Sequence, residues 1–161
     1  MYITLDEYTA LYEPVEEKVF NLLAYDAGRH IDRLTTGIDG VKKLKTAFPT
    51  DEDSAEAVKR CTAKIINILY QIQEAENSAS VGRGYIQTEN GLQGKVVSSV
   101  SAGNESISFS SGGTQASVID AAVSDLSARD TLIIGTIREY LSGVQDANGV
   151  NLLYMGVYPR V

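Results

Sequence analysis

The stretch VKRCTAKIINILYQIQEA, residues 58–75, decides the fold of this chain. Its apolar side chains recur in steps of three and four residues, which is the spacing of one helix face; they are Val58, Cys61, Ile65, Ile68, Ile72 and Ala75. Thr62, Ile66 and Leu69 broaden this face toward both flanks. A helix that is apolar on both flanks packs against neighbours on each side. We therefore predict a helix at the centre of a small bundle.

The residues before this stretch favour a helix start. Asp51, Asp53 and Ser54 are good N-cap residues, and the negative charges of the two aspartates suit the positive end of the helix dipole. We predict that the central helix covers about residues 52–77.

Further helices are predicted on both sides of the central one. Thr4-Leu5-Asp6-Glu7 has the form of a capping box and predicts a short helix over about 4–12. An apolar stripe predicts a second helix over about 15–36, which ends before Gly37 and Gly40. Another stripe predicts a helical segment over about 116–144, as one bent helix or as two, because Ser127-x-x-Asp130 can start a helix anew.

The segment of about residues 80–113 differs from its surroundings because it is rich in Ser and Gly and poor in charge. Alternation of apolar and Ser residues predicts two strands, 95–101 and 105–110, joined by Ala102-Gly103-Asn104. We predict a β-hairpin insertion. Two strands alone are marginal in water, so the hairpin needs a neighbour, which can be another subunit.

Length and composition bound the remaining possibilities. The chain has 161 residues with a net charge of −7, which suits one domain over 1–161 and argues against binding to nucleic-acid phosphates. No apolar run reaches the roughly 20 residues of a membrane helix, and the N-terminus lacks the pattern of a signal peptide. The single Cys favours a protein made in reducing cytoplasm.

Residues that carry chemistry are scarce. His30 is the only histidine, so no histidine-based metal cluster can form, and Cys61 falls on the buried stripe rather than at a reactive position. Asp51-Glu52-Asp53 does not continue as a calcium-binding loop, because Glu56 stands where such a loop needs Gly. The sequence therefore predicts no catalytic residues, no cofactor and no metal site.

A small basic patch remains at Lys42, Lys43 and Lys45. A solvated face is favoured over contact with nucleic acid, because no aromatic residues are interleaved with these lysines.

Two segments are candidates for interactions. The C-terminal arm, residues 150–161, is apolar for a chain end, and its candidate residues for docking on a partner are Leu152, Leu153, Tyr154, Val157 and Tyr158. Packing within the same domain is the equal alternative for the arm. In the hairpin, Val100, Ile107 and Phe109 are candidates for contacts between subunits, with covering of their own bundle as the favoured alternative.

Five stretches in order make the chain resemble the head–tail connector (adaptor, or head-completion) proteins of long-tailed bacteriophages and their prophages. They are Tyr8–Tyr12 ahead of Pro14, Ala27-x-x-x-Ile31-Asp32-x-Leu34-Thr35, Val58–Tyr70, Asn104–Phe109 and Leu152–Val157. Relatives often carry a basic residue where this chain has Met155, and their middle segment is commonly shorter. The hairpin is then a local elaboration.

The resemblance implies a function. Such proteins are small, non-enzymatic helical bundles that form a ring, usually of twelve subunits, under the portal protein of the filled capsid. The ring extends the DNA channel, which DNA passes without specific binding, and links the head to a stopper or tail-completion protein. We therefore expect a virion protein of the neck, made in the host cytoplasm. The acidic composition suits such a channel.

Two other classes compete with this expectation. One is a helical protein-interaction or regulatory module in the cytoplasm, which would be monomeric or dimeric. The other is a carboxylate-dependent hydrolase, which requires two acidic residues that converge away from helix starts. The sequence offers no such pair.

Overall fold

The computed structural model describes residues 1–159 except 82, 89–90, 97–99, 103–104 and 108–117. The helices are α1 (Leu5–Thr9), α2 (Glu17–Thr35), α3 (Lys43–Thr46), α4 (Glu52–Val81), α5 (Val118–Ser124) and α6 (Leu126–Leu141). The strands are β1 (Arg83–Thr88), β2 (Gly91–Val96), β3 (Val100–Ala102) and β4 (Glu105–Ile107). The predicted mainly helical class is confirmed.

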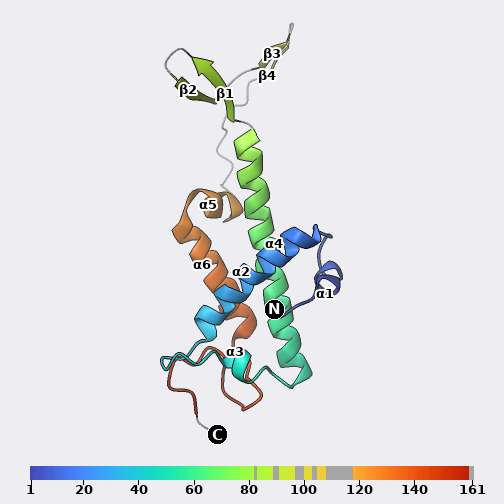
Figure 1. Cartoon of the computed structure of the whole chain (residues 1–161), viewed down its shortest axis with the longest axis vertical. Helices are drawn as coiled ribbons and strands as arrows, with labels where there is room; N and C mark the ends of the chain where they lie inside the picture. The colour runs from blue at the N-terminus through green and yellow to red at the C-terminus, as the bar shows by residue number, and fades with distance from the viewer. Residues whose placement is uncertain (82, 89–90, 97–99, 103–104, 108–117, 160–161) are drawn as a thin grey trace.

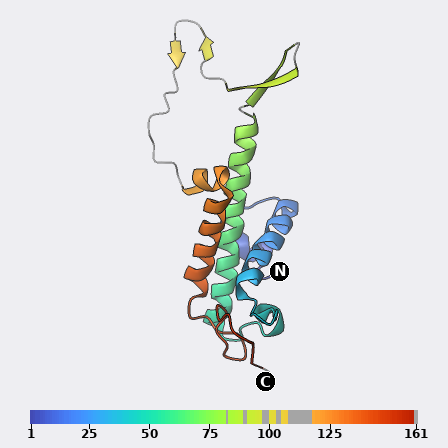
Figure 2. The ribbon, with the colours of Figure 1, turned by 90° about the vertical axis from the view of Figure 1, so that its left-hand side faces the viewer.

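Helix α4 is the axis of the molecule (Figure 1). It contacts α2, α5 and α6, and the turned view shows α6 running alongside its lower half (Figure 2). Helix α2 crosses α4 obliquely, so that its two ends lie on opposite sides of α4 (Figure 1). The predicted central position of α4 is therefore confirmed.

The predicted apolar stripe of α4 forms the core. Val58, Cys61 and Ile65 are fully buried, and Ile68 and Ile72 are nearly so. Val58, Cys61 and Ile65 pack with buried residues of α2 and α6, namely Phe20, Leu23, Ala27, Ile31, Ile133, Ile137 and Leu141. Ile68 and Ile72 form a second cluster with Ala122 of α5. Burial of each large side chain stabilises the fold by roughly 1.5–3 kcal/mol, so this seam is the main source of stability.

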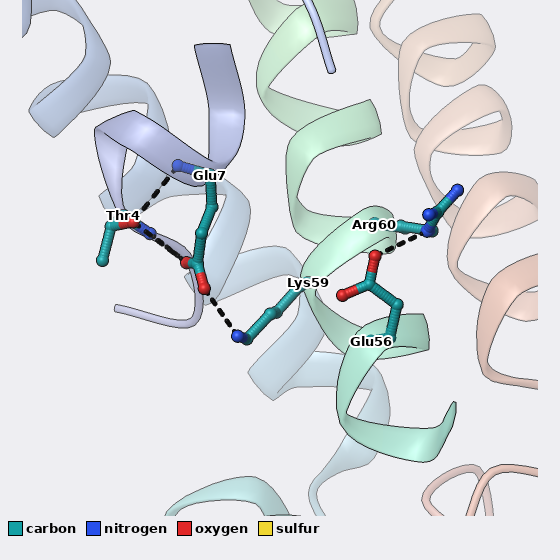
Figure 3. A network of polar contacts seen from close by, with 5 residues as sticks. All are labelled: Thr4, Glu7, Glu56, Lys59 and Arg60. Atoms are coloured by element: carbon teal, nitrogen blue, oxygen red, sulfur yellow. Dashed lines mark hydrogen bonds and ion pairs between the residues drawn. The ribbon is translucent and has the colours of Figure 1, made fainter. Parts of the chain in front are cut away.

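Polar contacts attach α1 to α4 (Figure 3). The Thr4 hydroxyl accepts from the Glu7 backbone N–H, and the Glu7 carboxylate accepts from the Thr4 backbone N–H at 2.8 Å, which is the predicted capping box. The same carboxylate lies 2.5 Å from the Lys59 ammonium of α4. This ion pair and the capping box lower the pKa of Glu7. Glu56 and Arg60 form a neighbouring pair within α4.

The helix starts follow local chemistry, with some shifts from the predicted bounds. The side chain of Asp51 accepts from the Ser54 N–H at 2.9 Å and caps α4 as predicted. Helix α4 continues to Val81, four residues beyond the predicted end at 77. Helix α2 begins at Glu17 rather than at the predicted residue 15.

The helical segment predicted over 116–144 is two helices. Asp125 adopts an extended conformation between α5 and α6, and its carboxylate accepts from the Ser127 N–H at 2.8 Å. Asp125 thus caps α6, whereas the restart predicted from Ser127 lies two residues too late. The Arg129 side chain donates to the carbonyl oxygen of Ala122 and ties the two helices together at the break.

The strands lie beyond the end of α4 (Figure 2). Strand β1 pairs with β2, and β3 pairs with β4, both in antiparallel orientation. The predicted strand bounds are not reproduced, because Lys95 and Val96 belong to β2 and Ala102 belongs to β3 rather than to a turn. The predicted β-hairpin insertion with contacts to another subunit stays a prediction.

Candidate functional site

The end of the molecule opposite the strands is built from irregular chain and the short helix α3, and we call it the base (Figure 1). It joins the loop of residues 36–42 to the C-terminal arm. Short bridges brace both parts, between Thr36 and Lys42 and between Gln145 and Asn151. The backbone N–H of Ile38 donates to the carbonyl oxygen of Met155 at 3.3 Å and links loop to arm.

Gly37 permits this close approach. A Cβ atom there would lie 2.9 Å from the backbone oxygen of Gly156, closer than real Cβ contacts allow. Any larger residue at position 37 would therefore push the arm away from the loop.

A buried lysine holds the arm from the inside. The Lys43 side chain is fully buried, and its ammonium donates to the carbonyl oxygen of Leu152 at 3.0 Å and to that of Tyr154. Burial lowers the pKa of Lys43, while attraction to Asp146 and Asp39 opposes that shift. A buried charge of this kind is tolerated because hydrogen bonds replace the lost water.

Tyr158 fastens the far part of the arm. Its hydroxyl donates to the buried Asp146 carboxylate at 2.6 Å and accepts from the Asn148 amide at 2.8 Å. Its backbone N–H donates to the Asp39 carboxylate at 2.8 Å. Burial and the hydrogen bond to Asp146 raise the pKa of Tyr158. Hydrogen bonds to Asp146, Asn148 and Asp39 thus hold this part of the arm in place.

The apolar side chains between these anchors face outward. Tyr154, Met155 and Val157 are exposed by 51%, 58% and 65%, and Ile38 of the neighbouring loop by 78%. We call these four residues the base patch. Exposed large apolar side chains that gather on an ordered surface mark interaction sites more often than singly scattered ones do.

The five docking candidates of the arm therefore separate into two groups. Leu152 and Tyr158 are buried in the chain's own fold, and Leu153 is half-buried against the core, which is the in-domain packing considered for the arm. Tyr154 and Val157 are exposed. Ile38 and Met155 were not among the candidates; for Ile38 the signal is an isolated large apolar residue in a Gly-rich turn.

The hairpin candidates are placed only in part. Val100 and Ile107 are Cα partners in the pairing of β3 with β4. Phe109 lies outside the described residues.

A second surface lies where α2 approaches α3. An open groove of ≈ 530 Å³ runs between them, and we call it the cationic groove; its lining includes Tyr25, Asp26, Arg29, His30, Asp32, Arg33, Lys42 and Lys45. Four of these side chains are basic and two are acidic, in a chain whose net charge is −7.

Two of the basic residues in the groove have acidic partners. Lys45 lies 3.0 Å from the Asp32 carboxylate, which also accepts from the Tyr2 hydroxyl, and Arg33 lies 3.7 Å from Asp130. Burial and the nearby Arg33 lower the pKa of His30, so this imidazole is neutral at pH 7.

The interpretation of Lys42, Lys43 and Lys45 as one solvated face is wrong for Lys43, which points inward to the arm. Lys42 and Lys45 are exposed, but they share their surface with Arg29 and with the Tyr25 ring. Sequence reasoning missed this grouping because α2 and α3 are separate along the chain.

Within the described residues, no three His, Cys, Asp or Glu side chains gather as a metal site. Burial raises the pKa of Cys61 to about 12, which keeps this thiol protonated at neutral pH. No helix in the described part of the chain is long and apolar enough to cross a membrane.

Comparison of the chain with protein-family models, with curated proteins and with solved structures found no match. The two surfaces, the base patch and the cationic groove, are therefore judged on their own chemistry.

Proposed function

We propose that this chain is a non-enzymatic structural protein of a bacteriophage neck. It forms a ring under the portal protein, extends the DNA channel and links the filled head to the tail or to the next neck component. The proposal begins from the resemblance of five ordered stretches to head–tail connector proteins. The small helical bundle is compatible with that resemblance.

The base patch is the observation that carries the proposal. Tyr154, Met155, Val157 and Ile38 expose apolar surface although the backbone beneath them is held by buried hydrogen bonds. Ordering an arm before binding reduces the entropy that docking must overcome. We assign the base patch to the portal protein and treat an adjacent subunit as the alternative partner.

The charge of the chain supports the channel. DNA that moves through a ring must not be held by its phosphates, and a net charge of −7 opposes such binding. The ring then guides DNA without recognising it.

The proposal is tested by binding to purified portal-bearing capsids. Combined substitution of Ile38→Ser and Val157→Ser removes apolar surface that faces solvent, so we expect normal folding and a loss of capsid binding of at least about tenfold, or roughly 1.4 kcal/mol. Leu22→Ser is the matched control, because Leu22 is 58% exposed on α2, away from the base. We expect it to bind like the original protein.

Electron microscopy of virions that carry a labelled copy of the chain gives the second test. We expect the label at the junction of head and tail. A label elsewhere, or equal binding to capsids with and without portal, would overturn the proposal and favour a cytoplasmic protein-interaction or regulatory module.

A further inference from the structure

The cationic groove contains two basic side chains without an acidic partner in the described residues, and Asp26 is the one carboxylate of its lining that is likewise unpaired there. Arg29 of α2 and Lys42 of the following loop are exposed, and neither makes a side-chain hydrogen bond or ion pair within the described residues. The Tyr25 ring, 65% exposed, flanks them. An acidic chain thus keeps a basic and aromatic groove open to solvent.

A complementary surface exists elsewhere on the same chain. The segment EPVEE, residues 13–17, leads from α1 into α2 and exposes Glu13, Glu16 and Glu17. In the described part of the molecule none of these three carboxylates has a hydrogen-bond or ion-pair partner. Pro14 restricts the backbone at its own position in this acidic segment, so less entropy is lost when the segment binds.

The groove and the acidic segment cannot meet within one molecule. Glu17 opens α2, and Arg29 lies 12 positions further along the same rigid helix, about 18 Å away at 1.5 Å per residue. The two ends of α2 also lie on opposite sides of α4 (Figure 1). An ion pair needs an N–O distance below about 4 Å, so any contact between the two surfaces joins two molecules.

We propose that the cationic groove binds the acidic segment, residues 13–17, of a second copy of this chain. Each copy then offers a groove on one side and an acidic segment on the other, which is a heterologous interface. Such an interface produces a ring when its rotation closes. This inference rests on the ring of the proposed function and names the charged contact between neighbouring subunits.

Duplex DNA is the less favoured ligand for the groove. Affinity for DNA comes from many Lys and Arg contacts to phosphates, whereas here only Arg29 and Lys42 are unpaired. The net charge of −7 adds repulsion over the whole surface. A short segment with three carboxylates can bind through the local positive charge of Arg29 and Lys42 alone.

A charge-exchange experiment on the full chain tests this contact. One variant combines Arg29→Glu with Lys42→Glu, and a second combines Glu13→Lys, Glu16→Lys and Glu17→Lys. Each variant alone places like charges on both surfaces, so we expect its self-association, measured by sedimentation velocity, to weaken at least about tenfold. In an equal mixture every groove meets a segment of opposite charge, so association should return.

A matched control separates the local contact from net charge. Lys64→Glu with Arg138→Glu changes the charge by the same amount as the groove variant, but at positions outside the groove. We expect this control to associate like the original chain. Added salt should weaken association of the original chain and of the mixture alike.

Three outcomes would overturn the inference. They are an original chain that stays monomeric at about millimolar concentration, a mixture that does not associate, and a groove variant whose main defect is lost binding to a short DNA duplex. The capsid test above is independent of this one. If the charge-exchange test succeeds but the chain does not bind portal-bearing capsids, the contact between copies stands and the proposed function is overturned.

Discussion

The interior of the bundle and the base of the molecule are held together by opposite means. Between α2, α4 and α6 the buried groups are almost all apolar, as at Ile65 and Ile133. At the base the buried groups include Lys43 and Asp146, while large apolar side chains lie on the outside. The centre of the bundle is held by apolar burial, whereas the base is held by buried polar groups and also exposes Ile38, Met155 and Val157.

This difference separates stability from interaction. Apolar burial is roughly proportional to area and does not depend on direction, so it stabilises the bundle without fixing the orientation of particular surface side chains. Hydrogen bonds require defined geometry, so Lys43 and Tyr158 fix where the arm lies and which side chains it turns outward. Substitutions in the two regions should therefore differ in size and in kind.

The largest effect is expected in the bundle. Ile65→Ala removes a fully buried side chain at the centre of α4 and leaves a cavity, so the free energy of unfolding should fall by about 2–5 kcal/mol in urea titration. Leu22→Ala is the control on the exposed face of α2 and should change stability by less than about 0.5 kcal/mol. Equal effects of both substitutions would mean that α4 does not form the core.

A smaller and local effect is expected from Lys43→Met. The carbonyl oxygens of Leu152 and Tyr154 lose their buried donor, which should cost about 1–3 kcal/mol. Amide exchange should quicken in the arm but not in α4. Lys45→Met is the control, because the exposed Lys45 side chain donates to no backbone carbonyl of the arm and its ion pair with Asp32 should contribute about 1 kcal/mol or less. Uniform loss of protection over the bundle would contradict the separation of the two regions.

Tyr158→Phe should act on the base alone and depend on pH. At pH 7 the lost hydrogen bond to Asp146 should cost about 1 kcal/mol. The pKa of Tyr158 is raised above its ordinary value of 10.0, so its contribution is full below pH 10 and is lost as pH rises through the folded pKa. The difference between the original chain and the variant should therefore shrink above pH 10.

The control for this prediction is Tyr25→Phe, since Tyr25 is exposed in the cationic groove and no hydrogen bond of its hydroxyl is found in the described residues. It should leave the unfolding free energy at pH 7 unchanged. A pH-independent cost of Tyr158→Phe would show that its hydroxyl does not hold the arm.

The smallest effect is expected from Glu7→Gln at the edge of the bundle. Its capping box and its pair with Lys59 are exposed, so the cost at pH 7 should be about 1 kcal/mol or less. The pKa of Glu7 is lowered below 4.5, so this contribution is present above pH 4.5 and is lost as pH falls through the folded pKa. Thermal unfolding of both chains should converge in acid, and Glu13→Gln should have no effect.

Much of the bundle could be predicted because its signals are local. The apolar spacing from Val58 to Ile72 follows the helix period, and the caps at Thr4 and Asp51 act within three residues. The residue at which α6 begins could not be predicted from the sequence, because both Asp125 and Ser127 are plausible caps. Only the backbone geometry identifies Asp125 as the cap.

The arm could not be predicted residue by residue. An irregular segment has no period, so Leu152 and Tyr154, two residues apart, carry the same apolar signal although one is buried and the other exposed. The same limit applies to Lys43, which looks like its neighbours Lys42 and Lys45 in the sequence. Its burial depends on carbonyl groups more than 100 positions away.

The sequence by itself determined the helices, the central place of α4 and the acidity of the chain, because these follow from spacing and composition. Only the tertiary structure decided the two candidate surfaces. The turn at Gly40, with φ of +77°, lets the chain reverse and brings Lys42 and Lys45 beside Arg29 and Arg33. The base patch likewise arises where the loop meets the arm, through contacts between distant segments that no local pattern encodes.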